Sequence, residues 1–185
     1  MPKTLPPAQA VEFLMGVLAG PDAMARVQAR KSLSDLGTPV VFALSEALRY
    51  SSSSQLRWEA AKTLALLMDP ASIPALLKAL EDGYPDVSWV AAEALGKFKR
   101  TAWPPLLDLL TKDWADSFLL RQRAQHVFRG QVEEGYNDLL VKLRASLVSP
   151  ESREAASAAA HEILERMKTP PTQPSSNGVP APSNP

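Results

Sequence analysis

One pattern of apolar and polar positions recurs along most of the chain. Each copy opens with Arg or Ser, carries Ala three residues later and places a further apolar residue four positions beyond that Ala. This spacing is what one buried stripe of an α-helix requires. The copies begin at Arg26, Arg57, Ser88, Arg121 and Ser152. The pattern therefore predicts five copies of one helix in an internal repeat with a period of about 31 residues.

A second apolar unit lies between these copies, at residues 73–80, 103–110 and 136–143. Its apolar residues also recur at spacings of three and four, and Pro74 and Pro104 fit a first helical turn, where a missing N–H has no partner to lose. Each repeat is therefore predicted to be helix, turn, helix. With a first helix over roughly residues 8–18, the expected pairs cover roughly residues 8–36, 39–67, 70–99, 101–130 and 132–167.

Small residues mark the expected stacking points between repeats. A methyl side chain lets a neighbouring helix approach closely, and neither helix of a pair can bury its stripe alone. The predicted column is Ala29, Ala60, Ala91, Ala124 and Ala155. We therefore expect an all-α solenoid of about five helix pairs that forms one domain over residues 1–168. Residues 169–185, rich in Pro and Ser, are predicted to be a disordered tail, because they cannot bury enough apolar surface.

Residues 56–64 and 69–82 carry a family resemblance. Their sequences, LRWEAAKTL and DPASIPALLKALED, resemble the short HEAT-type repeat shared with the phycobilin-lyase-like group. The resemblance extends over nearly the whole predicted domain. It implies a right-handed, armadillo-like superhelix of HEAT-like pairs, in which the Arg-x-x-Ala helices, here called inner helices, line the concave side. It also implies a binding scaffold, because the family consists largely of such proteins.

Register then indicates which inner-helix positions point into the groove. Ala and the later apolar residue face the core, so the first and fifth positions after the leading residue face outward. These positions are Val27, Trp58, Trp89, Gln122, Arg153, Lys31, Lys62, Glu93, His126 and Ser157.

Trp58 and Trp89 are the predicted apolar anchors of a partner. They occupy equivalent sites in adjacent repeats, where stacked helices lie about 8–10 Å apart, so the two indoles are expected side by side. Exposed Trp combines a large apolar area with an N–H and is frequent in interaction hot spots. The alternative is that both indoles only close the gap between repeats.

Polar candidates accompany the two indoles. A basic stripe on the fourth inner helix consists of Arg121, Arg123, His126 and Arg129, and Lys62 and Arg153 extend it along the groove. The acidic residues Glu59, Glu93 and Glu154 interleave with it. Such a groove suits an acidic peptide segment or a phosphate group on a protein partner. The alternative is a solvated helix face.

Composition narrows the classes of function. Twenty basic residues balance twenty acidic ones, which disfavours nucleic acid and anionic membranes as partners. No apolar run approaches a membrane span or a secretory signal, so we expect a cytoplasmic protein, monomeric or weakly oligomeric. The chain has no Cys, which excludes disulfides and thiolate metal sites.

Residues for catalysis are not apparent. A di-iron centre of the kind found in some helical-repeat enzymes needs ligands from at least two repeats, and only His161-Glu162 matches. Glycine-rich phosphate loops and nucleophile elbows are also missing from the sequence. We therefore predict that the chain is not an enzyme, uses no cofactor, and is an interaction module or scaffold that binds a protein or peptide along its concave face. Two alternatives stay open: a chromophore-binding protein like the phycobilin lyases, and a regulatory subunit of an enzyme complex.

Overall fold

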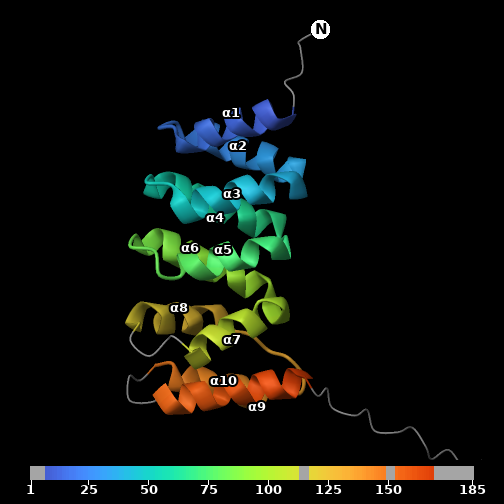
Figure 1. Ribbon diagram of the computed structural model, residues 1–185, viewed down its shortest axis with the longest axis vertical. Coiled ribbons are helices and arrows are strands. Elements are labelled where there is room, and N and C mark those ends of the chain that lie inside the picture. Colours follow the sequence, from blue (N-terminus) through green and yellow to red (C-terminus); the bar gives the residue numbers. More distant parts are fainter. Residues whose placement is uncertain (1–6, 113–116, 149–152, 169–185) are drawn as a thin grey trace, which may run out of the picture.

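The computed structural model describes residues 7–112, 117–148 and 153–168, which form helices and turns without a β-strand. The helices are α1 (Pro7–Ala19), α2 (Ala23–Leu36), α3 (Val41–Tyr50), α4 (Ser54–Leu67), α5 (Ile73–Ala79), α6 (Pro85–Lys97), α7 (Trp103–Lys112), α8 (Phe118–Phe128), α9 (Asn137–Ser146) and α10 (Arg153–Lys168). They stack in chain order along the long axis of the molecule (Figure 1). This arrangement confirms the predicted all-α solenoid of helix pairs.

The inner helices form one continuous row. Helices α2, α4, α6 and α8 pack successively on one another, while α3 packs on α5 in the outer layer. Within the pairs, α1 packs on α2, α3 on α4, α5 on α6 and α9 on α10. The row ends at α8, because α10 packs against α7 and α9.

The turn after each of the first four inner helices contains one residue with positive φ. Gly37, Met68, Lys99 and Gly130 have φ of 72°, 53°, 50° and 71°, and they follow one another at intervals of 31 residues. A left-handed residue ends a helix and turns the chain back. Short 3₁₀ turns at Thr38–Val40, Pro70–Ser72 and Lys99–Thr101 then lead into the outer helices α3, α5 and α7.

The leading Arg of the repeat has a structural role. Nη1 of Arg26 donates to the carbonyl oxygen of Gly20, and Nη1 of Arg57 donates to that of Ser51, each at 2.8 Å and six residues back. Arg57 also binds both carboxylate oxygens of Asp82, at 2.6 and 2.9 Å, and this hydrogen bonding raises the pKa of Arg57. Arg57 therefore links the turn before α4 to the segment that follows α5.

Stacking places the small column in the core, with one correction. Ala29, Ala60, Ala91 and Ala124 are buried as predicted, but Ala155 is exposed and Ala156 is buried in its place. The reason is the different packing of α10, which rests on α7 instead of continuing the row of inner helices. The later apolar position of the last copy, Ala159, is buried as predicted, so the departure from the pattern is confined to the first small position.

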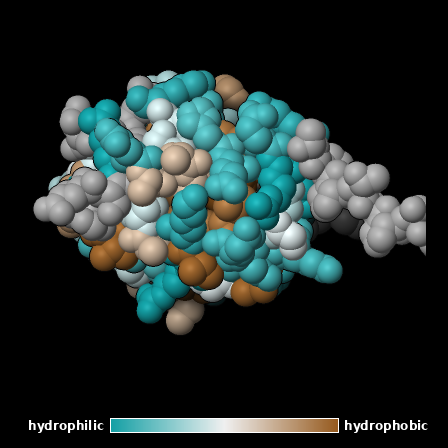
Figure 2. All heavy atoms as spheres, turned by 90° about the horizontal axis from the view of Figure 1, so that it is seen from below, coloured by the Kyte–Doolittle hydropathy of each residue, from teal (hydrophilic) through white to brown (hydrophobic). Residues whose placement is uncertain are grey.

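The predicted tail, residues 169–185, lies outside the described residues. In the described ranges no helix has the length and apolar character needed to cross a bilayer. Seen from the α9–α10 end, hydrophilic side chains cover much of the surface, with separate apolar patches between them (Figure 2).

Candidate partner-binding face

Two large hollows lie along the row of inner helices. The first, here called the Trp58 hollow, has a volume of about 380 Å³ between α2, α4 and α6. The second, here called the Trp89 hollow, has a volume of about 390 Å³ between α6, α8 and α9. A smaller hollow of about 260 Å³ lies on the other side of Trp58. The face formed by these hollows, called the inner-helix face below, is the candidate site.

Trp58 is half-buried and packs against the core. It therefore helps to close the gap between repeats and also leaves part of its indole accessible to a partner. The ammonium nitrogen of Lys62, one turn later on α4, lies 4.1 Å from the centroid of the Trp58 ring, within the range of a cation–π interaction. Leu66, another turn along, is 56% exposed and lines the same hollow. Glu93 is exposed on the opposite wall, where it meets Lys97 at 3.8 Å.

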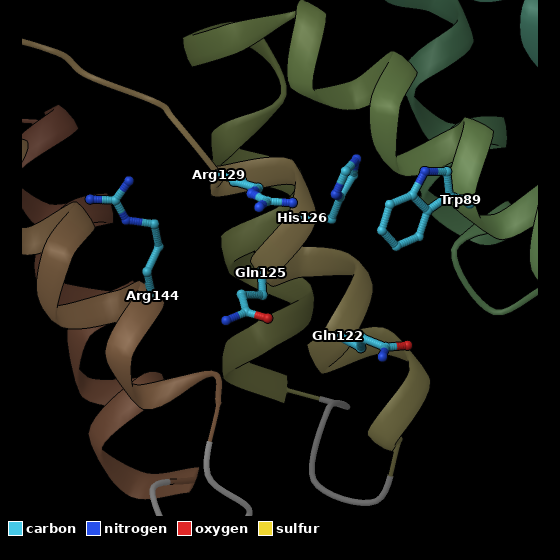
Figure 3. A pocket seen from close by; sticks show the side chains of 6 residues that line it. All are labelled: Trp89, Gln122, Gln125, His126, Arg129 and Arg144. Carbon is cyan, nitrogen blue, oxygen red and sulfur yellow. The ribbon is translucent and has the colours of Figure 1, made fainter.

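Trp89 is the more accessible indole, with 42% of its surface exposed. Its ring centroid lies 4.1 Å from that of His126, with the two planes tilted by 39°. Figure 3 shows Trp89 on α6 at one side of the hollow and Arg144 on α9 at the other, with His126 and Arg129 of α8 between them. Three helices thus contribute to one aromatic and basic site.

The two indoles, which we predicted to lie side by side, each pack against a different side chain. Trp58 is covered by Lys62, and Trp89 by His126. They line different hollows, so they offer a partner two separate contact points instead of one double ring.

Arg123 differs most from its predicted role. It is 5% exposed, its Nε donates to the hydroxyl oxygen of Ser88 at 3.0 Å, and its guanidinium carbon lies 5.1 Å from the Trp89 ring centroid. Burial lowers the pKa of Arg123. Ser88 occupies the leading position where three of the other four repeats have Arg, and Arg123 reaches back from the next repeat into that space. It supports Trp89 from within the protein and does not line either hollow.

Two further polar residues lie away from the hollows. Arg121, at the start of α8, is half-buried, and its guanidinium lies 5.8 Å from the Phe118 ring centroid. Glu59, expected among the acidic groove residues, is 1% exposed. It accepts hydrogen bonds from Arg26, at 3.0 Å, and from Arg30, so it fastens α4 to α2.

The environment of His126 favours the neutral imidazole. Burial is the main cause of its lowered pKa, and the positive charges of Arg129 and Arg123 act in the same direction, while Glu93 opposes them. Near neutral pH, His126 therefore adds aromatic surface to the Trp89 hollow, and the positive charge there belongs to Arg129 and Arg144.

Sequence reasoning missed Arg144, Gln125 and Leu66. Arg144 lies on α9, the outer helix of the fifth repeat, and our groove positions were drawn from inner helices alone. Gln125 lies one position before the predicted groove residue His126, and Leu66 lies on the same α4 face as Trp58 and Lys62, two turns after Trp58. The i, i+4, i+8 spacing was a usable signal for Leu66. Nothing in the linear sequence indicated Arg144.

Metal-binding chemistry finds no support in the described part of the chain, where no group of three or more His, Asp or Glu side chains is arranged to hold an ion. His161 and Glu162, the single pair that resembled a di-iron motif, are both exposed on α10, and Glu162 meets Lys142 at 3.3 Å.

Comparison with known proteins agrees with this architecture. The family described as HEAT repeats matches residues 41–129, which contain both indoles and most of both hollows. Among solved structures, the fold is similar to a chain in the complex of CpcE and CpcF of phycocyanin lyase from Nostoc sp. PCC7120. The TM-score is 0.56 at 21% sequence identity, over 82% of this chain and 98% of that one. No curated protein matches the sequence.

Proposed function

Because residues 41–129 are HEAT repeats, we propose that the chain is a non-catalytic module that binds a protein or peptide along its inner-helix face. The observation that carries this proposal is Trp89, an indole that stays 42% exposed in a hollow although its helix, α6, packs on both neighbouring inner helices, α4 and α8. Large aromatic side chains in hollows with a polar surround are typical of interaction hot spots.

The remaining candidates divide into two contact points. Around Trp58, the hollow offers the apolar Leu66 together with Lys62 and Glu93, a mixed surface that can accept an apolar side chain and a polar one. Around Trp89, His126 enlarges the aromatic surface. Arg121 and Arg123 act indirectly in this proposal, because Arg123 supports the Trp89 ring and Arg121 lies at the start of α8. Helices with fixed packing keep the two points at a constant separation, which limits the entropy lost on binding.

The test compares Trp89→Ala with a matched change of another exposed aromatic residue. Phe42, on the outer helix α3, is 76% exposed and lines none of the three hollows of the inner-helix face. The immobilised full chain and both variants are used to capture proteins from the native lysate, and captured proteins are quantified by mass spectrometry. We expect Trp89→Ala to weaken retention of a specific partner by about 30-fold, as for a hot-spot residue, and Phe42→Ala to leave it unchanged.

Thermal unfolding followed by circular dichroism serves as the control for folding. If Trp89→Ala and Phe42→Ala reduce capture equally, the inner-helix face is not the binding surface. A regulatory subunit and a passive scaffold would use the same surface, and addition of the chain to its captured partner distinguishes them through any change in that partner's activity.

Chromophore binding is the alternative proposal, because the fold is similar to a chain of the phycocyanin lyase complex. If the chain binds a chromophore, a compound that absorbs visible light should co-purify with the wild-type chain from its native lysate and should be lost from Trp89→Ala. A colourless preparation that retains a protein partner supports the interaction module instead.

A further inference from the structure

The Trp89 hollow carries an uncompensated positive charge. Its lining consists of Trp89, Gln122, Gln125, His126, Arg129 and Arg144, without an acidic side chain. Arg129 is exposed and Arg144 half-buried, and neither forms an ion pair with any residue in the described ranges. At least six of the eleven arginines in the described ranges pair with a carboxylate, whereas Arg129 and Arg144 do not and line the same hollow.

The contrast with the Trp58 hollow is informative. There the positive side chains of Arg30, Lys62 and Lys97 face Glu93, and Arg30 is already bound to the buried Glu59. That hollow therefore has no strong preference for one sign of charge. Near the Trp89 hollow, Glu93 is the acidic residue whose charge acts on His126. Its carboxylate is already paired with Lys97 at 3.8 Å.

Two arginines from different helices fit one kind of ligand group. A guanidinium presents its N–H donors in a planar fork that matches the two oxygens of a carboxylate. Arg129 directly follows α8 and Arg144 lies on α9, and Figure 3 shows the amide of Gln125 below Arg129, with Arg144 to the left of both. Trp89 and His126 form an aromatic wall on the other side of the hollow.

We propose that the Trp89 hollow recognises an acidic residue of the bound peptide, with its carboxylate between Arg129 and Arg144 and a neighbouring apolar side chain on Trp89. This inference rests on the proposed function and specifies the chemistry of the partner. Arg129 and Arg144 are its specificity-determining residues. The amides of Gln122 and Gln125 supply further donors at the same site.

The experiment selects binders for the full chain from a phage-displayed library of random peptides. Wild type is expected to enrich peptides that carry Asp or Glu next to an apolar or aromatic residue. The double variant Arg129→Glu with Arg144→Glu is expected to enrich Lys or Arg at that position instead. The matched control is Lys112→Glu with Arg153→Glu, which changes the net charge equally at a separate hollow between α7 and α10 and should keep the wild-type preference.

An enriched peptide is then synthesised with Glu, Gln or phosphoserine at the selected position, and its affinity is measured by fluorescence anisotropy. We expect the Gln form to bind at least about tenfold more weakly than the Glu form, because a charge-assisted hydrogen bond is lost. Equal affinity of the Gln and Glu forms would overturn the inference, as would a phosphoserine form that binds more than tenfold tighter than Glu, which would assign the site to phosphate.

The two levels of the proposal fail in different ways. Enriched peptides without an acidic residue, whose binding still depends on Trp89, would overturn the carboxylate site and leave the proposed function intact. If wild type enriches no peptide that depends on Trp89, both are contradicted. Thermal unfolding of the double variant shows whether it is folded, and selection of basic peptides by it would itself require a folded hollow.

Discussion

Glu59 shows how a single buried charge holds two repeats together. Its carboxylate is 1% exposed and accepts hydrogen bonds from Arg26 and Arg30 of the preceding inner helix and from Gln55 of its own. A buried carboxylate with several donors is fully compensated, but the removal of its charge leaves two largely buried arginines without a counter-ion.

We expect Glu59→Gln to lower the free energy of unfolding by about 3 kcal/mol, because one partner of a buried ion pair is lost. Urea unfolding followed by circular dichroism gives this value. Glu93→Gln is the control on the next inner helix, since Glu93 is exposed and should change stability by less than about 0.5 kcal/mol. Equal effects of the two substitutions would show that the Glu59 contacts do not contribute to stability.

The stability of the fold depends on pH through His126, and the surroundings of the imidazole set the direction of this dependence. Its pKa in the folded chain is lowered, mainly by burial, from the ordinary value of about 6.5. Between the ordinary and the lowered pKa the unfolded chain binds more protons, so stability falls as pH decreases through that interval and levels off below it.

The chain has two histidines, so NMR titration of the imidazole C–H signals tests this directly, with His126→Gln to assign them. We expect the His126 signal to titrate at lower pH in the folded chain than in urea. The stability advantage of wild type over His126→Gln should also shrink from pH 8 to pH 5. An inflection at or above the value in urea would contradict the buried position of the imidazole against Trp89.

At the scale of the element, the residue that ends an inner helix fixes how the chain turns. Gly37 has φ 72° and ψ −148°, a conformation that is essentially restricted to glycine, and a Cβ there would meet no atom within 4 Å. Any cost of a side chain at this position is therefore a cost of the backbone alone.

Gly37→Ala should destabilise the chain by about 1–3 kcal/mol for this reason. Gly83 is the matched position, since a Cβ there also meets open space but φ is not positive. Gly83→Ala should leave stability unchanged or raise it by up to about 1 kcal/mol, because it restricts the unfolded chain. Thermal unfolding of the two variants gives the comparison, and similar losses for both would remove the role assigned to the turn.

The last helix tests the register that the structure assigns. The repeat pattern places Ala155 in the core, whereas the structure buries Ala156 and exposes Ala155. Ala156→Leu should therefore cost about 1–3 kcal/mol through overpacking, while Ala155→Leu should change stability by less than about 0.5 kcal/mol. The reverse order in a thermal unfolding experiment would restore the register of the repeat.

These cases indicate what the sequence can and cannot predict. Spacings of three and four residues, the 31-residue period and the column of small residues predicted the helix pairs and their stacking, because those features follow from local periodicity. The packing of α10 on α7 depends on contacts between distant helices, so the pattern misplaced Ala155. Arg123 was misjudged for a similar reason: as part of the basic stripe it was expected to contact a partner, but Ser88 of another helix leaves the space that it fills.

At the scale of the whole molecule, the candidate site is spread over several repeats. Trp58 and Glu93 belong to successive inner helices, and the Trp89 hollow is completed by Arg144 from an outer helix two repeats further along the chain. Periodicity within one repeat predicts which residues are exposed. It does not predict which exposed residues of different repeats meet, and that is why the basic half of the Trp89 hollow emerged only from the three-dimensional arrangement.

The hydrogen bond between Arg123 and Ser88 limits how this chain can be rearranged. In the first two repeats, the leading Arg reaches the turn just before its own helix, so that contact stays within one segment. In the third, the corresponding space is filled from the fourth. A cassette cut between residues 98 and 117 would separate donor from acceptor and leave Trp89 without its support. Exchange of a single repeat at this boundary therefore removes a contact that supports Trp89, so a chimaera that is to keep the Trp89 hollow should carry the third and fourth repeats together.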